Sequence, residues 1–273
     1  MGGGEMDEKE GRWADPSAGR LQRAPHPEAV NEAAVFRLTA RDLALAGLLC
    51  DVGPATATQA AAWLGPGPSE SSFRRARARV RTLTHWGWLT EVRWCTGEGR
   101  SGSPLVGPGP MAAKRTLAPR WRWEPELVCR TVPTHQLLLR VRHVQRGWWP
   151  MKPGGGPLAG YLLVHDRQVT VAVIRSGCSE PERLRVALTE RTPKGPLWVV
   201  AATPQELPAA AQACAAAGLL KRSAFTTDAN LWHEGTPIAD AWWIAQDGTT
   251  LQPARLTALV NGDVVGAEVS GRV

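Results

Sequence analysis

The stretch 69-SESSFRRARARVRTLTHWGWL-89 decides the fold of the first half of the chain. Phe73, Ala76, Val80 and Leu83 recur at spacings of three and four residues, which places them on one face of a helix. Five arginines lie off that apolar stripe: Arg74, Arg75, Arg77, Arg79 and Arg81. The stretch therefore predicts an amphipathic helix over residues 69–85 with a strongly basic outer face.

Two shorter helical patterns precede this basic helix. Residues 38–49 carry an apolar face, and Thr39 is suited to cap the helix, with the acid Asp42 three residues on. Residues 58–64 form the second pattern, which the rigid turn at residues 65–68 ends. The order so far is short helix, short helix, long basic helix.

A two-stranded ribbon is expected after the basic helix. Residues 90–94 read as a strand, residues 97–110 as a loop rich in Gly, Pro and Ser, and residues 114–123 as the returning strand. Three helices followed by such a ribbon are typical of a winged helix-turn-helix. We therefore expect this DNA-binding domain over residues 35–125, after a disordered segment at residues 1–34.

Strands alternate with helices in the second half. We expect helices at residues 134–146, 180–188 and 205–219, and strands at 161–164, 169–174, 197–201, 223–226 and 241–245. This alternation predicts a mixed α/β domain over residues 134–250, followed by a tail at 251–273 with little pattern. The fold class is therefore α+β or α/β in two domains.

Composition favours a polyanionic partner. The chain has 273 residues and a formal net charge of +7, which suits nucleic acid. Its five cysteines are scattered without a C-x-x-C pair, so we expect reduced thiols rather than disulfides or a structural zinc. The polar start and the lack of a long apolar run predict a soluble cytoplasmic protein without a membrane partner.

The candidate DNA contacts come from the basic helix and the ribbon. A helix in the major groove needs small polar and basic groups near its N-terminal end, and arginine can donate two parallel hydrogen bonds to guanine or phosphate. The candidates are Ser69, Ser71, Ser72, Arg74, Arg75, Arg79, Arg93, Arg100, Lys114 and Arg115. Arg77 and Arg81 are expected to be merely solvated or paired with acids elsewhere.

Two runs resemble the N-terminal domain of the replication-relaxation family: residues 38-LTARDLALAGLLCDVGPATATQAAAWL-64 and 72-SFRRARARVRTLTHWGWL-89. The resemblance implies a winged-helix protein of plasmids or other mobile elements. Its second domain would be similar to restriction-endonuclease-like folds, with 157-PLAGYLLVHDRQVTVAVIRSG-177 at the catalytic strands.

The expected nuclease acids are missing from that stretch. A metal-dependent nuclease of this type needs an aspartate after a proline, then an acid and a lysine on the next strand, to hold Mg²⁺ and orient water. Pro157 is followed by Leu158 and Ala159, and residues 171–175 carry no carboxylate. We therefore expect a pseudo-nuclease domain with no catalytic residues, no metal and no cofactor.

Three functions follow from these observations. The first is a non-catalytic double-stranded DNA-binding protein of a plasmid or mobile element, acting in replication, conjugative relaxation or transcriptional control. It could also bind a second copy of itself or a mobile-element partner protein. The second is a metal-dependent DNA-nicking enzyme whose acids lie elsewhere, with Asp240 as one candidate. The third is a protein-interaction adaptor, in which the winged helix docks a partner and the tryptophan pairs at residues 148–149 and 242–243 form a contact surface.

Overall fold

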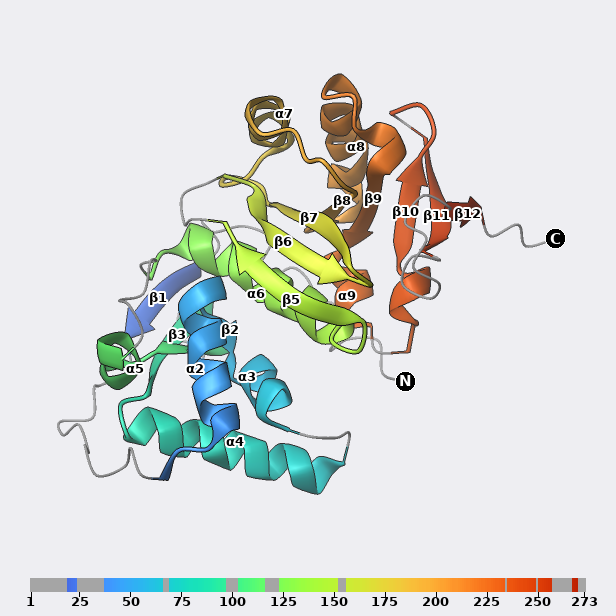
Figure 1. Cartoon of the computed structure of the whole chain (residues 1–273). Coiled ribbons are helices and arrows are strands. Elements are labelled where there is room, and N and C mark those ends of the chain that lie inside the picture. The colour runs from blue at the N-terminus through green and yellow to red at the C-terminus, as the bar shows by residue number, and fades with distance from the viewer. Residues whose placement is uncertain are drawn as a thin grey trace, which may run out of the picture. The chain divides into compact units, whose positions relative to one another are not determined.

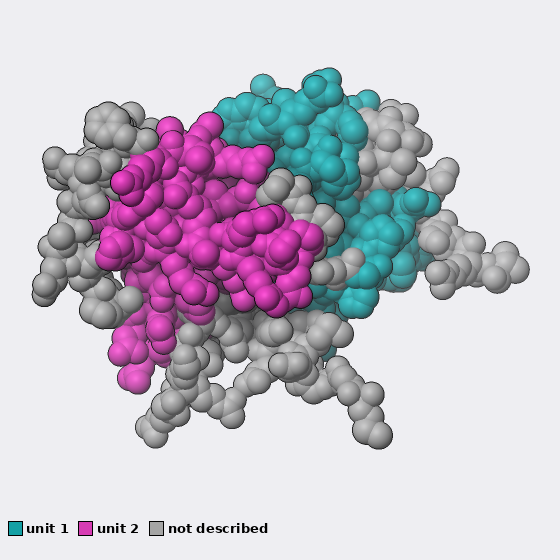
Figure 2. Space-filling model, turned by 90° about the horizontal axis from the view of Figure 1, so that it is seen from below, with its two compact units in different colours: residues 1–16, 136–273 teal, residues 17–135 magenta. Residues whose placement is uncertain are grey.

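The structure is a computed structural model that describes residues 19–23, 37–65, 69–96, 103–115, 123–151, 156–233, 235–248, 250–256 and 267–269. The chain divides into two compact units, drawn in different colours in Figure 2. Residues 17–135 form one unit, and residues 136–273 together with residues 1–16 form the other. The elements are a mixture of helices and sheets, as the sequence predicts at this coarse level.

The unit of residues 17–135 combines short helices with a small antiparallel sheet (Figure 1). Its helices are α2 (Ala40–Val52), α3 (Ala57–Leu64), α4 (Glu70–His85), α5 (Pro110–Arg115) and the first part of α6 (Pro125–Arg140). Its strands are β1 (Gly19–Arg23), β2 (Ala55–Thr56), β3 (Leu89–Thr96) and β4 (Ser103–Pro108). Over the described residues the strand order is β1-β3-β4-β2.

Local capping fixes where the three leading helices begin. Thr39 and Asp42 form a reciprocal capping box at α2, and Thr56 forms one with Gln59 at α3. Ser69 caps α4 by accepting a hydrogen bond from the backbone N–H of Ser72. The three helices then bury one shared apolar cluster, which includes Leu45, Leu49, Ala60, Leu64, Ala76, Val80 and Leu83.

The predicted ribbon is correct in its first strand and wrong in its second. The strand that returns against β3 is β4, which lies within the stretch expected to be a loop. Its prolines and glycine hide the strand in the sequence, but Leu105 and Val106 are both completely buried there. Lys114 and Arg115, expected on the returning strand, instead end α5, and residues 116–122 of that expected strand lie outside the described residues.

The segment expected to be disordered at residues 1–34 also contains a strand. β1 pairs antiparallel with β3 over five residues, from Gly19 opposite Thr96 to Arg23 opposite Val92. This pairing occupies the edge of β3 that β4 leaves open. A long-range partner of this kind leaves no local signal in a short polar stretch.

The second unit is built on one large sheet. Its strands are β5 (Gln145–Pro150), β6 (Leu158–Val164), β7 (Arg167–Ile174), β8 (Leu197–Ala201), β9 (Ser223–Thr227), β10 (Trp242–Ala245), β11 (Leu251–Leu256) and β12 (Ala267–Val269). Its helices, besides the end of α6, are α7 (Pro181–Glu190), α8 (Leu207–Ala216) and α9 (Asp228–Trp232), with 3₁₀ turns at Pro204–Glu206, Leu220–Arg222 and Ile238–Asp240.

The strands of this sheet follow one another in reverse chain order, from β12 at one edge to β5 at the other, over the described residues. β7, β8 and β9 are parallel and their neighbours are antiparallel. α7 and α8 make the crossovers between the parallel strands and lie together (Figure 1). Their apolar residues pack with Ala172, Val199 and Phe225 of the sheet.

Two expectations for this unit need correction. The tail at residues 251–273 was expected to lack pattern, but Leu251–Leu256 and Ala267–Val269 add two strands to the sheet. The helix expected at residues 134–146 instead begins at Pro125, and residues 145–150 form β5. Pro133 lies inside this helix and hides its continuity in the sequence.

Candidate nucleic-acid interface

The helix α4 presents a buried face and a charged outer face. Ser72, Ala76, Val80 and Leu83 are the buried residues, all within 7% exposure. Phe73, expected within the apolar stripe, is only half-buried at its margin. The outer face is opposite to this stripe, as the helical period of 3.6 residues requires.

Arg74, Arg77 and Arg81 share the outer face of α4. Their spacings of three and four residues place them in one row along the helix, and all three are exposed. Arg74 forms an ion pair of 3.0 Å with Glu70, and both side chains are more than three-quarters exposed. Such an exposed pair is held weakly, so Arg74 can exchange Glu70 for another anion.

Arg77 and Arg81 also line a groove of about 490 Å³, together with Arg93 of β3. The other lining residues are Ala57, Thr58, Val80, Glu91 and Pro104. Arg77 donates a 3.2 Å hydrogen bond to the Thr58 hydroxyl, and its guanidinium lies 4.8 Å from the centre of the Phe73 ring. Three arginines face one glutamate here, so the groove favours an anion such as a phosphate.

Glu91 only partly offsets the charge of this groove. Its carboxylate lies 3.8 Å from Nε of Arg93, whose side chain is half exposed. This distance is longer than a charge-assisted hydrogen bond. Arg93 therefore forms only a long ion pair with Glu91 on the wall of the groove.

The side chain of Arg79 is directed toward α2, where it has a structural role. Its Nη2 and Nε donate to the two carboxylate oxygens of Asp42 at 2.6 and 3.0 Å, and Nη2 also donates to the carbonyl of Arg37. Its guanidinium lies 4.9 Å from the centre of the Trp86 ring. Arg79, predicted as a DNA contact, is therefore engaged within the protein, where its side chain joins α4 to α2.

The ionisation of Asp42 reflects this pairing. Burial of the carboxyl works against its charged form, but the hydrogen bonds from Arg79 and Thr39 outweigh burial and hold the pKa of Asp42 below its usual value. The same bond to Asp42 raises the pKa of Arg79. The pair is thus fully charged at neutral pH.

The three serines expected as contacts have different environments. Ser69 and Ser71 are exposed at the start of α4, with their hydroxyls 3.4 Å apart. Ser72 is 7% exposed and belongs to the buried face, one helical turn before Ala76. Ser72, predicted as a DNA contact, therefore does not lie on the exposed face of α4.

The other residues predicted as DNA contacts do not lie on the outer face of α4. Arg75 is exposed on the opposite flank of α4, beside α2. Arg100 lies outside the described residues, and Lys114 and Arg115 lie on α5 rather than on the ribbon. Arg77 and Arg81, expected to be solvated, are indeed exposed, and their spacing from Arg74 places them in one row with it.

Two acids of the second unit, Asp228 and Asp240, form ion pairs. Arg175, at the end of β7, donates a 2.7 Å hydrogen bond to Asp228, and both side chains are completely buried. Nε of Arg255 lies 3.3 Å from a carboxylate oxygen of Asp240. Among the described residues there is no group of three or more His, Cys, Asp or Glu side chains suited to hold a metal ion.

The tryptophan pairs are split between interior and surface. Trp242 is 1% exposed, and its ring centroid lies 4.9 Å from that of the buried Trp198 at a tilt of 46°, whereas Trp149 on β5 is 53% exposed. Within the described part of the chain no helix has the length and apolarity needed to cross a membrane.

Comparisons with known proteins identify no relative. No family model matches the chain, and neither a curated protein nor a solved structure matches it. The family resemblance therefore rests only on the sequence runs at residues 38–64, 72–89 and 157–177.

Proposed function

We propose that residues 17–135 act as a winged helix-turn-helix that binds double-stranded DNA, with α4 in the major groove. The element order α2-β2-α3-α4-β3-β4, with β2 paired to the far side of β4, supports this reading. In such domains the third helix enters the groove and the hairpin contacts the flanking backbone. A role in plasmid or mobile-element DNA is proposed from the resemblance of residues 38–64 and 72–89 alone.

One observation carries the proposal. Arg74, Arg77 and Arg81 form a row on the exposed face of α4, and the last two share a groove with Arg93 of the hairpin. A row of guanidinium groups on a helix can donate to guanine edges and to phosphates at once. The cations of the groove are placed to neutralise phosphates beside the helix.

The proposed contact set differs from the sequence-based one. Arg74, Arg77, Arg81 and Arg93 make the contacts, with Ser69 and Ser71 at the start of the helix. Arg79 contributes indirectly by anchoring α4 to Asp42. Binding proceeds without catalysis, and neither a cofactor nor a metal takes part.

Duplex affinity of an Arg77→Gln/Arg81→Gln double variant tests this proposal. Each lost phosphate contact lowers the slope of log affinity against log salt by about 0.9, so the double variant should lose a slope of about 2 and bind at least about tenfold more weakly. Fluorescence anisotropy on a labelled duplex measures both quantities.

The matched control is Arg185→Gln/Arg222→Gln, which removes two exposed arginines of the other unit. It lowers the net charge equally and should leave affinity and slope near wild type. Equal losses in the two double variants would mean that binding follows net charge alone, and the assignment of α4 would fail.

A further inference from the structure

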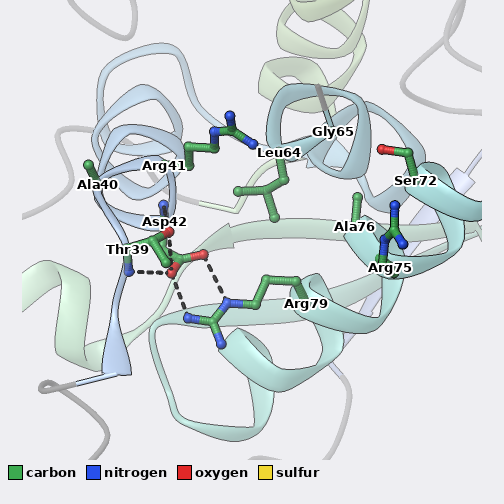
Figure 3. A pocket seen from close by; sticks show the side chains of 10 residues that line it. All are labelled: Thr39, Ala40, Arg41, Asp42, Leu64, Gly65, Ser72, Arg75, Ala76 and Arg79. Atoms are coloured by element: carbon green, nitrogen blue, oxygen red, sulfur yellow. Dashed lines mark hydrogen bonds and ion pairs between the residues drawn. The ribbon is translucent and has the colours of Figure 1, made fainter. Parts of the chain in front are cut away.

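A second pocket lies on the flank of α4 opposite to the DNA-contacting row. It has a volume of about 580 Å³, within the range of small-molecule sites. Residues from α2, from the end of α3 and from α4 line it: Thr39, Ala40, Arg41, Asp42, Leu64, Gly65, Ser72, Arg75, Ala76 and Arg79 (Figure 3).

The lining carries unbalanced positive charge. Asp42 is already held by Arg79 through two hydrogen bonds. Arg41 and Arg75 are both exposed, and among the described residues neither has an ion pair or a side-chain hydrogen bond. In the view of Figure 3 these two arginines lie on either side of Leu64 and Ala76. A ligand between them would therefore meet two uncommitted guanidinium groups.

The lining also includes a serine hydroxyl. Ser72 lines the pocket, and Figure 3 draws its side chain among the lining residues. A hydroxyl can donate a hydrogen bond to an anion.

The floor of the pocket is apolar. Leu64 and Ala76 are buried parts of the helical core and also line the pocket, and Gly65 next to them has no side chain. A bare inorganic ion would use the arginines but not this surface. An apolar body with one anionic group would use both.

From these contacts we infer that the pocket binds a small organic anion, in which a carboxylate or phosphate group is joined to an apolar body. One of the two flanking arginines, Arg41 or Arg75, holds the anionic group, and Leu64 and Ala76 contact the apolar part. The site does not depend on DNA binding, since none of its exposed arginines belongs to the row Arg74, Arg77 and Arg81.

Titration of the full chain with phenyl phosphate, benzoate and inorganic phosphate tests the inference, with binding followed by calorimetry. Phenyl phosphate or benzoate should bind at least about tenfold more tightly than inorganic phosphate, and Arg41→Gln/Arg75→Gln should weaken that binding by at least about tenfold. Both substituted side chains are exposed, so the variant should fold. Arg77→Gln/Arg81→Gln is the matched control and should bind the probes as wild type does.

Three results would overturn the inference. The first is no binding of either organic probe, and the second is equal binding of inorganic phosphate, which would leave the apolar floor without a role. The third is unchanged probe binding in the Arg41→Gln/Arg75→Gln variant. If wild type binds neither organic probe and Arg41→Gln/Arg75→Gln loses duplex affinity, the pocket is instead a contact for the phosphates of the DNA backbone. Failure of the DNA proposal is recognised separately, through Arg77→Gln/Arg81→Gln.

Discussion

The guanidinium of Arg79 donates two hydrogen bonds, of 2.6 and 3.0 Å, to the carboxylate of Asp42, which lies 37 residues earlier in the chain. The Asp42 side chain is 1% exposed, and Arg79 is 28% exposed. The same carboxylate also accepts from the backbone N–H and the hydroxyl of Thr39. One ion pair therefore joins the first turn of α2 to the middle of α4.

Removing Arg79 should destabilise this unit. Arg79→Ala leaves a buried carboxylate without its cation, which costs about 3 kcal/mol. Chemical denaturation followed by tryptophan fluorescence measures the loss. Arg81→Ala is the control, because Arg81 is exposed on the same helix, and it should change stability by less than about 0.5 kcal/mol. Equal stability of the two variants would show that the pair is not structural.

His135 should make stability depend on pH. It is completely buried, and its Nε2 donates to the carbonyl of Gly53 at 3.0 Å. Burial lowers the pKa of His135 to about 4, although the bond to Gly53 opposes this shift. The folded protein therefore keeps the imidazole neutral, whereas the unfolded chain takes up a proton near pH 6.5.

The sign of the pH effect follows from this difference. Between about pH 6.5 and pH 4 the unfolded state binds the extra proton, so stability falls as pH falls, by about 3 kcal/mol in all. His135→Gln, which does not titrate, should flatten the dependence in this window. Thermal unfolding at a series of pH values measures it. A variant that keeps the full wild-type dependence would assign the effect to another group.

The buried pair of Arg175 and Asp228 predicts an asymmetric response to mutation. Asp228→Ala leaves the buried guanidinium without its carboxylate and should cost about 3–5 kcal/mol. Arg175→Met/Asp228→Leu removes both charges and should recover much of that loss, because an apolar pair of similar volume is often as stable. Denaturation curves of the two variants decide the matter. A double variant no more stable than the single one would contradict the prediction.

Binding without catalysis is also testable. Supercoiled plasmid incubated with the protein and Mg²⁺ or Mn²⁺ should stay supercoiled on an agarose gel. Asp240→Ala is the informative variant, since Asp240 was the acid considered for a metal site and now lies beside Arg255. Nicking by wild type that disappears in Asp240→Ala would establish the enzymatic alternative.

Local patterns predicted α2, α3 and α4, the first three helices of this unit, well. The Thr39–Asp42 capping box and the stripe of Ala76, Val80 and Leu83 are confirmed. They are readable because both depend on residues three or four apart. The returning strand β4 and the strand β1 were missed, since their pairing with β3 joins segments whose own sequences are rich in Pro, Gly or charge.

The candidate site was only partly predictable. The sequence pointed to α4 as the basic helix, but it could not sort the arginines by role. Arg79 is engaged because Asp42 lies opposite to it in space, and Arg77 and Arg81 share a groove because β3 brings Arg93 beside them. These relations depend on how α2, α4 and the hairpin pack.

The sequence by itself determined the three helices, their caps, the basic character of α4 and the alternating elements of the second half, because each of these follows from neighbours within one or two helical turns. Only the tertiary structure decided which arginines are held and which remain exposed, and that Arg41 and Arg75 flank one pocket. The physical reason is that burial and charge pairing depend on distances between segments, and sequence spacing alone does not contain those distances.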